Sequence, residues 1–226
     1  MCGRFAQFSL PEDLESYFDI PAGFDFPPPR YNVAPGTEML AVRAGSDGRP
    51  AFVRLHWGLI PGWAKDRRLG YRTINARAET LAEKPAFRAA FQSRRCLIPA
   101  DGFYEWKATP SGKQPYFIAH QEGRPLAFAG LWETWADRDT GEVVLSGTII
   151  VTAANALIGQ IHDRMPVILQ PRDFQTWLDP TRKAVAELQE LLRPCPVEQL
   201  NIHPVSTRVN RPVEDDPALI QPLSDT

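Results

Sequence analysis

The sequence has 226 residues, of which 43% are hydrophobic and 23% are charged, with 25 Lys and Arg against 27 Asp and Glu. These proportions are those of a folded globular protein and exclude a disordered or fibrous chain. The formal net charge of -2 excludes a globally basic nucleic-acid binder, so any site for a nucleic acid has to be a local patch.

Short predicted elements follow one another along the chain. Residues 9–12 (SLPE) predict a capping box that starts a short helix, and the proline-rich run 23–36 is expected to lack regular structure. Residues 37–44 and 51–57 predict two strands joined as a hairpin by the GSDG turn. Further strands are predicted over 94–100, 103–107, 115–120, 125–132, 147–153 and 166–170. Helices are predicted over 79–92, where Pro85 breaks or begins the helix, and over 155–162, 172–178 and 181–192.

This order of elements predicts the fold class. Strands dominate, the helices are short, and the two do not alternate regularly as they do around a parallel sheet. We therefore expect an α+β fold, with a mainly antiparallel, curved or barrel-like β-sheet and short peripheral helices. The length suffices for one substantial core, so a single domain is expected over residues 1–226.

The N-terminus reads MCGR, which places a cysteine directly after the initiator methionine. Cysteine is small enough to allow removal of Met1, and we expect the mature chain to begin with Cys2. Its α-amine and thiol have reference pKa values of about 7.7–8 and about 8.5, and together they form an aminothiol that can condense with an aldehyde to a thiazolidine. The alternative is that Met1 is retained and Cys2 is simply a small buried residue.

Residues 73–80 (TINARAET) place polar side chains at alternate positions. In an extended strand, Asn75, Arg77 and Glu79 project to one face. Arg77 is then placed to bind a phosphate, and Asn75 to donate a hydrogen bond to a developing oxyanion. A solvated strand face with an Arg–Glu ion pair is the alternative interpretation.

Two further segments carry side chains that suit proton transfer. Glu105 lies between aromatic residues in ADGFYEWK (100–107), where an apolar environment raises a carboxyl pKa toward neutrality, unless the side chain points outward. His162 in IHDRMP (161–166) ends a predicted helical stretch. Its imidazole has a reference pKa suited to proton shuttling, and the alternative is an interaction with the helix dipole alone.

The segment 56–72 combines cationic and aromatic side chains. This mixture is typical of single-stranded nucleic-acid binding, in which cations contact the backbone and flat rings stack on bases, although a charged loop beside core tryptophans has the same composition. The residues are Lys65, Arg67, Arg68, Arg72, Trp57, Trp63 and Tyr71. The four histidines and three cysteines show no metal-ligand spacing, so we expect no metal and no cofactor.

Several motifs occur together in the order of one family. They are MCGR (1–4), YNVAPG (31–36), WGLIPGW (57–63), NAR (75–77), ADGFYEW (100–106), IHDRMP (161–166) and HPVS (203–206). From Met1 to about Asn210, the chain resembles the SOS-response-associated peptidase (SRAP) family, also described as abasic-site processing proteins. The resemblance implies a barrel-like domain that binds single-stranded DNA and captures abasic sites covalently through the N-terminal cysteine, which shields the lesion.

The resemblance also implies roles for individual residues. The implied catalytic residues are Cys2 as nucleophile, Asn75 to position the amine or a sugar oxygen, Glu105 as general acid and base, and His162 as a proton shuttle. The implied DNA contacts are Arg4 and Arg77, with Trp57, Trp63 and Arg164 as further candidates.

Two other activities remain open at this point. The family's older name implies a cysteine peptidase that frees its own N-terminus with Cys2, Glu105 and His162, and a noncovalent single-stranded DNA-binding module would not need Cys2. The expected partner is single-stranded DNA with abasic sites, without a membrane, and the expected state is a monomer. Since no signal peptide, apolar span or CxxC pair is found, we expect a cytoplasmic location, associated with the nucleoid in a bacterium.

Overall fold

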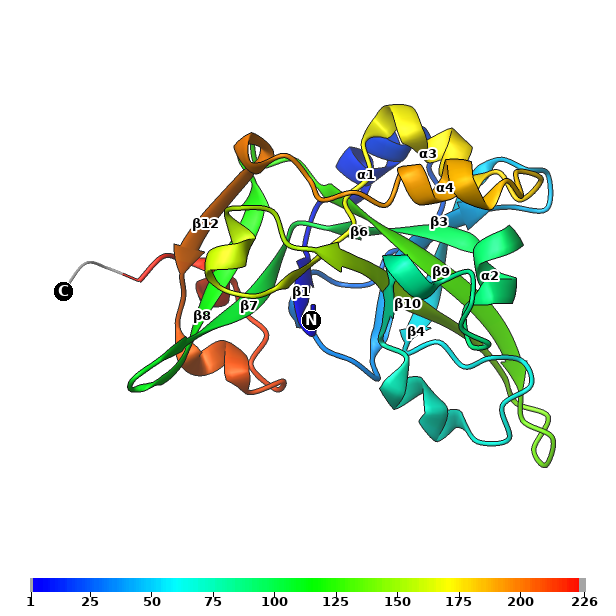
Figure 1. Ribbon diagram of the computed structural model, residues 1–226, viewed down its shortest axis with the longest axis horizontal. Helices are drawn as coiled ribbons and strands as arrows, with labels where there is room; N and C mark the ends of the chain where they lie inside the picture. The colour runs from blue at the N-terminus through cyan, green and yellow to red at the C-terminus, as the bar shows by residue number, and fades with distance from the viewer. Residues whose placement is uncertain (1, 224–226) are drawn as a thin grey trace.

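The computed structural model describes residues 2–223 and contains two β-sheets, with strand β1 at the centre of the molecule (Figure 1). The first sheet has five strands in the order β12, β8, β7, β1, β2, and all neighbouring strands are antiparallel. They are β1 (Phe5–Gln7), β2 (Arg30–Val33), β7 (Gly102–Thr109), β8 (Gly112–His120) and β12 (Leu200–Pro204).

The second sheet closes on itself as a five-stranded barrel, because β9 pairs with both β6 and β10. The order around the barrel is β10, β4, β3, β6, β9, and the β4–β10 pair is parallel whereas the others are antiparallel. The strands are β3 (Glu38–Ala44), β4 (Pro50–Trp57), β6 (Arg95–Ala100), β9 (Leu126–Ala136) and β10 (Val143–Ala153). The predicted α+β class with a barrel-like, mainly antiparallel sheet is confirmed.

Strand β10 extends beyond the barrel and changes its neighbours there. Its residues Ile149–Val151 pair in parallel with β5 (Asn75–Arg77), and its last residues pair with β11 (Arg164–Pro166) in the antiparallel direction. Because β5 and β11 both pair with the same end of β10, two segments that carry predicted site residues are fixed on either side of that strand.

Short helices lie around the barrel, and α1, α3 and α4 gather at one end of it (Figure 1). Ring stacking of Phe18 on Phe174, with centroids 5.3 Å apart, joins α1 to α3. The α-helices are α1 (Pro11–Phe18), α2 (Arg88–Ser93), α3 (Pro171–Leu178) and α4 (Val185–Glu190). The 3-10 helices are η1 (Arg67–Arg72), η2 (Ala78–Thr80), η3 (Ile158–Gln160), η4 (Val197–Gln199), η5 (Thr207–Asn210) and η6 (Pro217–Ile220).

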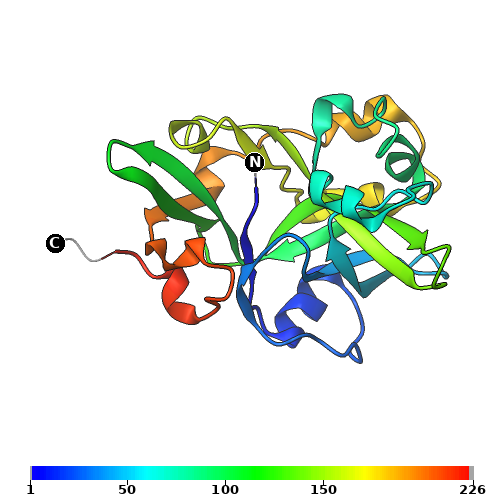
Figure 2. The same ribbon diagram turned by 90° about the horizontal axis from the view of Figure 1, so that it is seen from below.

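Both views show β1 between β7 of its own sheet and the barrel (Figure 2), and aromatic side chains pack β1 against the barrel strands. The ring of Phe5 contacts Trp57 and Phe128 edge to face, at centroid distances of 5.0 and 6.0 Å. Phe103 of β7 contacts Phe128 in the same way at 5.8 Å. All four side chains are fully buried, and each such pair contributes about 0.5–1.5 kcal/mol beyond area burial. The residues just before Phe5 are therefore held in a defined place.

Three local predictions near the N-terminus have different outcomes. The hairpin over 37–57 is confirmed as β3 and β4. The capping box is wrong, because Leu10 is the N-cap without a side-chain bond and Ser9 instead hydrogen-bonds the carboxylate of Asp101. The run 23–36 is not wholly irregular, since its last part forms β2 against β1.

Predicted helices and one strand are shorter in the structure. The predicted interruption at Pro85 is confirmed, since η2 precedes it and α2 follows it, but both helices are short, and the helix expected over 155–162 is reduced to η3. The backbone N–H groups of Glu83 and Lys84 both donate to the carbonyl of Thr80 and form a turn just before Pro85. A continuous helix cannot pass through this proline, because it lacks an N–H donor. The strand expected over 166–170 ends at Pro166, and Ile168 forms only an isolated bridge to Phe128.

Candidate functional site

Cys2 precedes β1, from which Gly3 and Arg4 separate it, and it has no solvent exposure. The side-chain Nδ2 of Asn75 donates a hydrogen bond of 2.8 Å to the backbone carbonyl of Cys2. Burial raises the pKa of the Cys2 thiol, and the nearby charge of Glu105 raises this pKa further. The thiol is therefore neutral before any reaction and needs a proton acceptor to become a nucleophile.

The other end of the Asn75 amide is available to a substrate. Its Oδ1 is buried, and no donor within residues 2–223 hydrogen-bonds it. An unsatisfied buried acceptor costs about 1–3 kcal/mol. A donor such as an amine or a sugar hydroxyl that enters beside Cys2 would recover this free energy.

Glu105 lies on β7 beside the first residues of the chain. The backbone N–H of Tyr104 donates to the carbonyl of Arg4 at 3.0 Å, which sets β7 against the N-terminal segment. The Glu105 side chain is 2% exposed. Burial raises the pKa of its carboxyl to about 7, with a smaller increase from the charge of Asp163. A carboxyl with this pKa can accept and return a proton at neutral pH.

His162 follows η3 and precedes β11. Its Nδ1 accepts a hydrogen bond of 3.0 Å from the backbone N–H of Arg164, and the carboxylate of Asp163 lies 2.9 Å from the same nitrogen. Burial lowers the pKa of His162, against the opposing effect of Asp163. The ring is thus neutral at physiological pH and offers a second group for proton exchange.

Glu105 and His162 meet in one open pocket of about 400 Å³. The pocket is lined by Arg4, Glu105, Trp106, Lys113, His162 and Asn210. The predicted catalytic residues are therefore close together, because Cys2 is buried within electrostatic reach of Glu105 and bonded to Asn75. The predicted removal of Met1 lies outside the described residues.

Three pocket residues are absent from the sequence-based set of site residues. Trp106 follows Glu105 directly, and Lys113 lies on the neighbouring strand β8, where it pairs with Ala108 of the same hairpin. That hairpin pattern is a signal that points to Lys113. Asn210 has no such signal: it arrives from η5, and its Oδ1 accepts a hydrogen bond of 2.7 Å from Trp106 Nε1.

The basic residues predicted to contact DNA have different environments. Arg4 lines the pocket, and Arg77 at the end of β5 is exposed. Arg164 forms an ion pair with the carboxylate of Glu79 at 2.5 Å. The Arg–Glu pair considered for Arg77 is therefore made by Arg164 instead. Glu79 itself lies in η2, because the strand ends at Arg77 and the predicted alternation stops there.

The two tryptophans predicted to contact DNA differ completely in exposure. Trp57 is fully buried, and its Nε1 donates to the carbonyl of Ile74 at 2.9 Å, so its ring has no face free for a base. It is a core residue, which corrects the expectation of a base contact. Trp63 is 58% exposed and Tyr71 is 69% exposed. Only these two rings of the 56–72 segment are free to stack.

The loop that carries Trp63 is held by a close backbone contact. Gly58 has φ +134, and a Cβ on it would lie 2.6 Å from the carbonyl oxygen of Gly70, so glycine is required there. Trp63 and three cationic side chains, Lys65, Arg68 and Arg72, line a shallow pocket of about 600 Å³. Part of this charge is cancelled, since Asp66 pairs with Arg68 at 2.5 Å.

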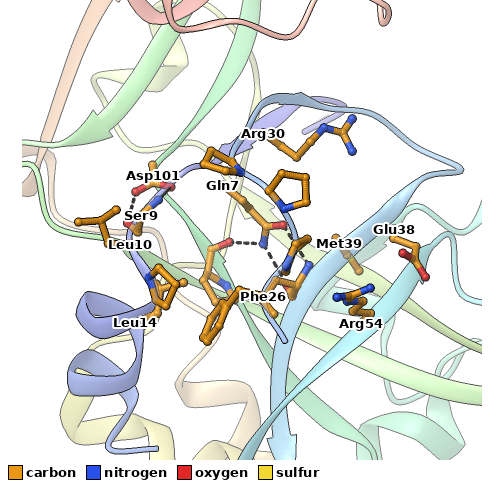
Figure 3. Close-up of a pocket in the computed structure, with 16 residues that line it drawn as sticks. Gln7, Ser9, Leu10, Leu14, Phe26, Arg30, Glu38, Met39, Arg54 and Asp101 are labelled. Atoms are coloured by element: carbon orange, nitrogen blue, oxygen red, sulfur yellow. Dashed lines mark hydrogen bonds between the residues drawn. The ribbon is translucent and has the colours of Figure 1, made fainter. Parts of the chain in front are cut away.

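A separate, more enclosed pocket of about 440 Å³ lies past the other end of β1, between α1 and the segment 26–30 (Figure 3). Its lining is mostly apolar. The polar side chains of Gln7 and Asp101 are engaged within the protein, Gln7 with the backbone of Leu40 and Pro99 and Asp101 with Ser9.

No group of three or more His, Cys, Asp or Glu side chains within residues 2–223 could hold a metal ion. No helix in the same range is long and apolar enough to span a membrane.

Comparisons with known proteins identify one family model and several similar proteins. A family model described as SOS response associated peptidase (SRAP) matches residues 1–212. The abasic site processing protein YoqW of Bacillus subtilis is 45% identical over 98% of this chain and 99% of its own length, and YedK of Escherichia coli, with the same description, is 34% identical over 99% and 100%. A crystal structure of a protein from Bacteroides thetaiotaomicron superposes with a TM-score of 0.89 at 26% identity, covering 98% of this chain and 100% of that chain.

Proposed function

Because the chain belongs to the SOS response associated peptidase (SRAP) family, we propose that it processes abasic sites in DNA as part of the response to DNA damage. In this proposal it binds single-stranded DNA and captures the opened abasic sugar covalently through Cys2. The product is a DNA–protein cross-link that shields the lesion from strand cleavage and error-prone copying.

The observation that supports this proposal most directly is the combination of groups around Cys2. A buried thiol, a carboxyl whose pKa is raised to about 7 and an amide bonded to the Cys2 carbonyl are gathered at the start of the chain. An opened abasic sugar exposes an aldehyde, and an aldehyde is the electrophile for which an aminothiol is suited.

The reaction balances with these groups alone. After removal of Met1, the α-amine of Cys2 adds to the aldehyde carbon, and loss of one water molecule leaves an imine. The thiol then gives its proton to Glu105 while its sulfur adds to the imine carbon, and the nitrogen takes up a proton as the thiazolidine closes. Glu105 acts as a base in one step and as an acid in the other, which is typically worth 10²- to 10⁴-fold in rate.

Asn75 and His162 have supporting roles in this scheme. The free Oδ1 of Asn75 accepts from the attacking amine or from a sugar hydroxyl, and its Nδ2 keeps the Cys2 backbone in place. The neutral ring of His162 exchanges protons with the sugar as it opens. Arg4, Arg77 and Arg164 contact phosphates, and Trp63 stacks on a base.

The test is a denaturing gel of protein incubated with a single-stranded oligonucleotide that carries one abasic site. Wild type should give a heat-stable adduct, and Cys2→Ala should give none. Cys195→Ala is the matched control, since Cys195 is also a buried free cysteine but lies in a different segment. An adduct of equal yield in Cys2→Ala would overturn the proposal.

The same experiment separates the two other activities. A cysteine peptidase with Cys2, Glu105 and His162 would cleave peptides and give no DNA adduct. A noncovalent DNA-binding module would shift the oligonucleotide on a native gel with or without Cys2 and leave nothing attached after denaturation.

A further inference from the structure

Arg4 is held on the pocket wall by uncharged oxygen atoms. Its Nη1 donates to Asn32 Oδ1 at 2.9 Å and to the carbonyl of Val209 at 2.6 Å, and its Nη2 donates to the carbonyl of Asn210 at 3.4 Å. Within residues 2–223, no carboxylate forms an ion pair with Arg4. Its positive charge is therefore fixed in place without being cancelled.

Two neighbouring arginines, unlike Arg4, form ion pairs with carboxylates. Arg30, two residues before Asn32 on β2, pairs with the carboxylate of Asp215. Arg208 pairs with Glu214 at 2.6 Å and with Asp216 at 2.5 Å. Carboxylates are thus abundant in the segment 214–216, yet an amide side chain is the one that contacts Arg4.

Asn32 is fully buried, and both ends of its amide are used. Its Oδ1 accepts from Arg4, while its Nδ2 lies within bonding distance of the carbonyls of Val209 (3.3 Å), Arg211 (3.1 Å) and Glu214 (2.8 Å). An aspartate of the same size has no N–H for these carbonyls and would add a negative charge beside the guanidinium. The amide of Asn32 both accepts from Arg4 without adding charge and donates to the backbone carbonyls.

We propose that Asn32 is a positioning residue that orients Arg4 through a neutral contact, so that the guanidinium keeps its full charge for a phosphate group of single-stranded DNA. This inference rests on the proposed function and deepens it. Arg4 retains donors for this purpose, since its Nε–H has no acceptor within residues 2–223 and Nη2 has one long bond. Nε–H and Nη2–H form the side edge of the guanidinium, which can bind two phosphate oxygens at once.

The test measures noncovalent affinity for an undamaged oligothymidine over a range of NaCl concentrations. For single strands, the slope of log K against log salt changes by about 0.7 for each phosphate contact. If Asn32→Asp cancels the charge of Arg4, the magnitude of the slope should fall by about 0.7, and the affinity at 0.1 M salt should fall about fivefold.

The matched control is Asn201→Asp, which adds the same charge at an exposed position of β12. Its slope should equal that of wild type. An unchanged slope in folded Asn32→Asp, or an equal fall in Asn201→Asp, would overturn the inference. A merely structural role of Asn32 would lower the melting temperature without changing the slope of the folded protein.

A second variant keeps the inference testable if Asn32→Asp gives no cooperative thermal transition. Arg4→Gln removes the charge and retains a donor for Asn32, so its slope should fall by the same amount, and an unchanged slope overturns the inference. The proposed function fails separately: wild type would then form no adduct with abasic DNA, whatever the slopes of the variants.

Discussion

The side-chain amide of Asn75 and the backbone carbonyl of Cys2 are joined by a hydrogen bond of 2.8 Å, across 73 residues of sequence. Strand β5 is itself held by its parallel pairing with β10. The position of Cys2 is thus set by the barrel and not only by the strand that follows it.

Loss of this hydrogen bond should slow capture without abolishing binding. A net hydrogen bond is worth about 0.5–1.5 kcal/mol, so Asn75→Ala should lower the single-turnover rate of adduct formation at saturating DNA by about 2- to 13-fold. Asn201→Ala, at an exposed position, serves as the control. A rate equal to that of wild type would mean that Asn75 plays no part in placing Cys2.

Glu105→Gln should separate chemistry from binding. The amide keeps the shape of the side chain but cannot take the proton of the Cys2 thiol, so adduct formation should fall by about 10²- to 10⁴-fold. Affinity for an undamaged single strand, measured by fluorescence anisotropy, should stay within about twofold. Equal losses of both quantities would point to a folding defect instead.

The same carboxyl should make stability depend on pH. The pKa of Glu105 is raised by burial to about 7 in the folded state and is about 4.3 in an unfolded chain. Between these values the folded protein holds a proton that the unfolded chain has lost, so the free energy of unfolding should fall as pH rises from about 4 to about 7 and then level off.

Glu105→Gln removes this dependence. Urea denaturation should find the variant more stable than wild type at pH 8, by on the order of 3 kcal/mol at most, and close to wild type near pH 4. A difference between the two proteins that stays constant across this range would contradict the raised pKa of Glu105.

Stacking on Trp63 should contribute to DNA affinity. Base stacking on an aromatic side chain is worth about 1–3 kcal/mol, so Trp63→Ala should weaken binding of a single strand by about 5- to 150-fold. Leu10→Ala is a suitable control, since Leu10 is 55% exposed but borders the separate pocket of Figure 3. Equal affinities of the two variants would remove Trp63 from the DNA surface.

An alanine inserted between Met1 and Cys2 should abolish the adduct. The thiol is then still present, but the free α-amine belongs to another residue, so no thiazolidine can close. Noncovalent binding of a single strand should persist, and intact-mass spectrometry of the wild-type protein should show loss of the initiator methionine. A normal adduct yield from the inserted variant would rule out the aminothiol mechanism.

Local sequence patterns predicted the strands of the barrel well but not its closure. The hairpin β3–β4 follows from alternation and a glycine-containing turn, both of which are properties of neighbouring residues. The parallel pairing of His56 with Ser146 closes the barrel across 90 residues, and nothing local marks it. Ser9 illustrates the same limit, because a carboxylate 92 residues away takes the side chain that would otherwise cap a helix.

The candidate site shows a similar division. Cys2, Asn75, Glu105 and His162 were predicted through motifs, and the structure gathers them. Trp57 lies in an equally distinctive motif but is buried, since a motif does not tell whether a ring faces the core or the solvent. Asn210 was missed because its place depends on the bonds of η5 with Arg4 and Trp106, which only the folded chain reveals.

The pocket that contains Glu105 takes one wall from Arg4 and another from Asn210, which lies 206 residues later in the chain. During translation, the segment that carries the thiol leaves the ribosome long before the segment that completes its surroundings. Since Val209 and Asn210 must dock before Arg4 is fixed, a nascent chain cannot hold an assembled site. The pocket that the proposed capture uses is therefore assembled only after these residues have been synthesised.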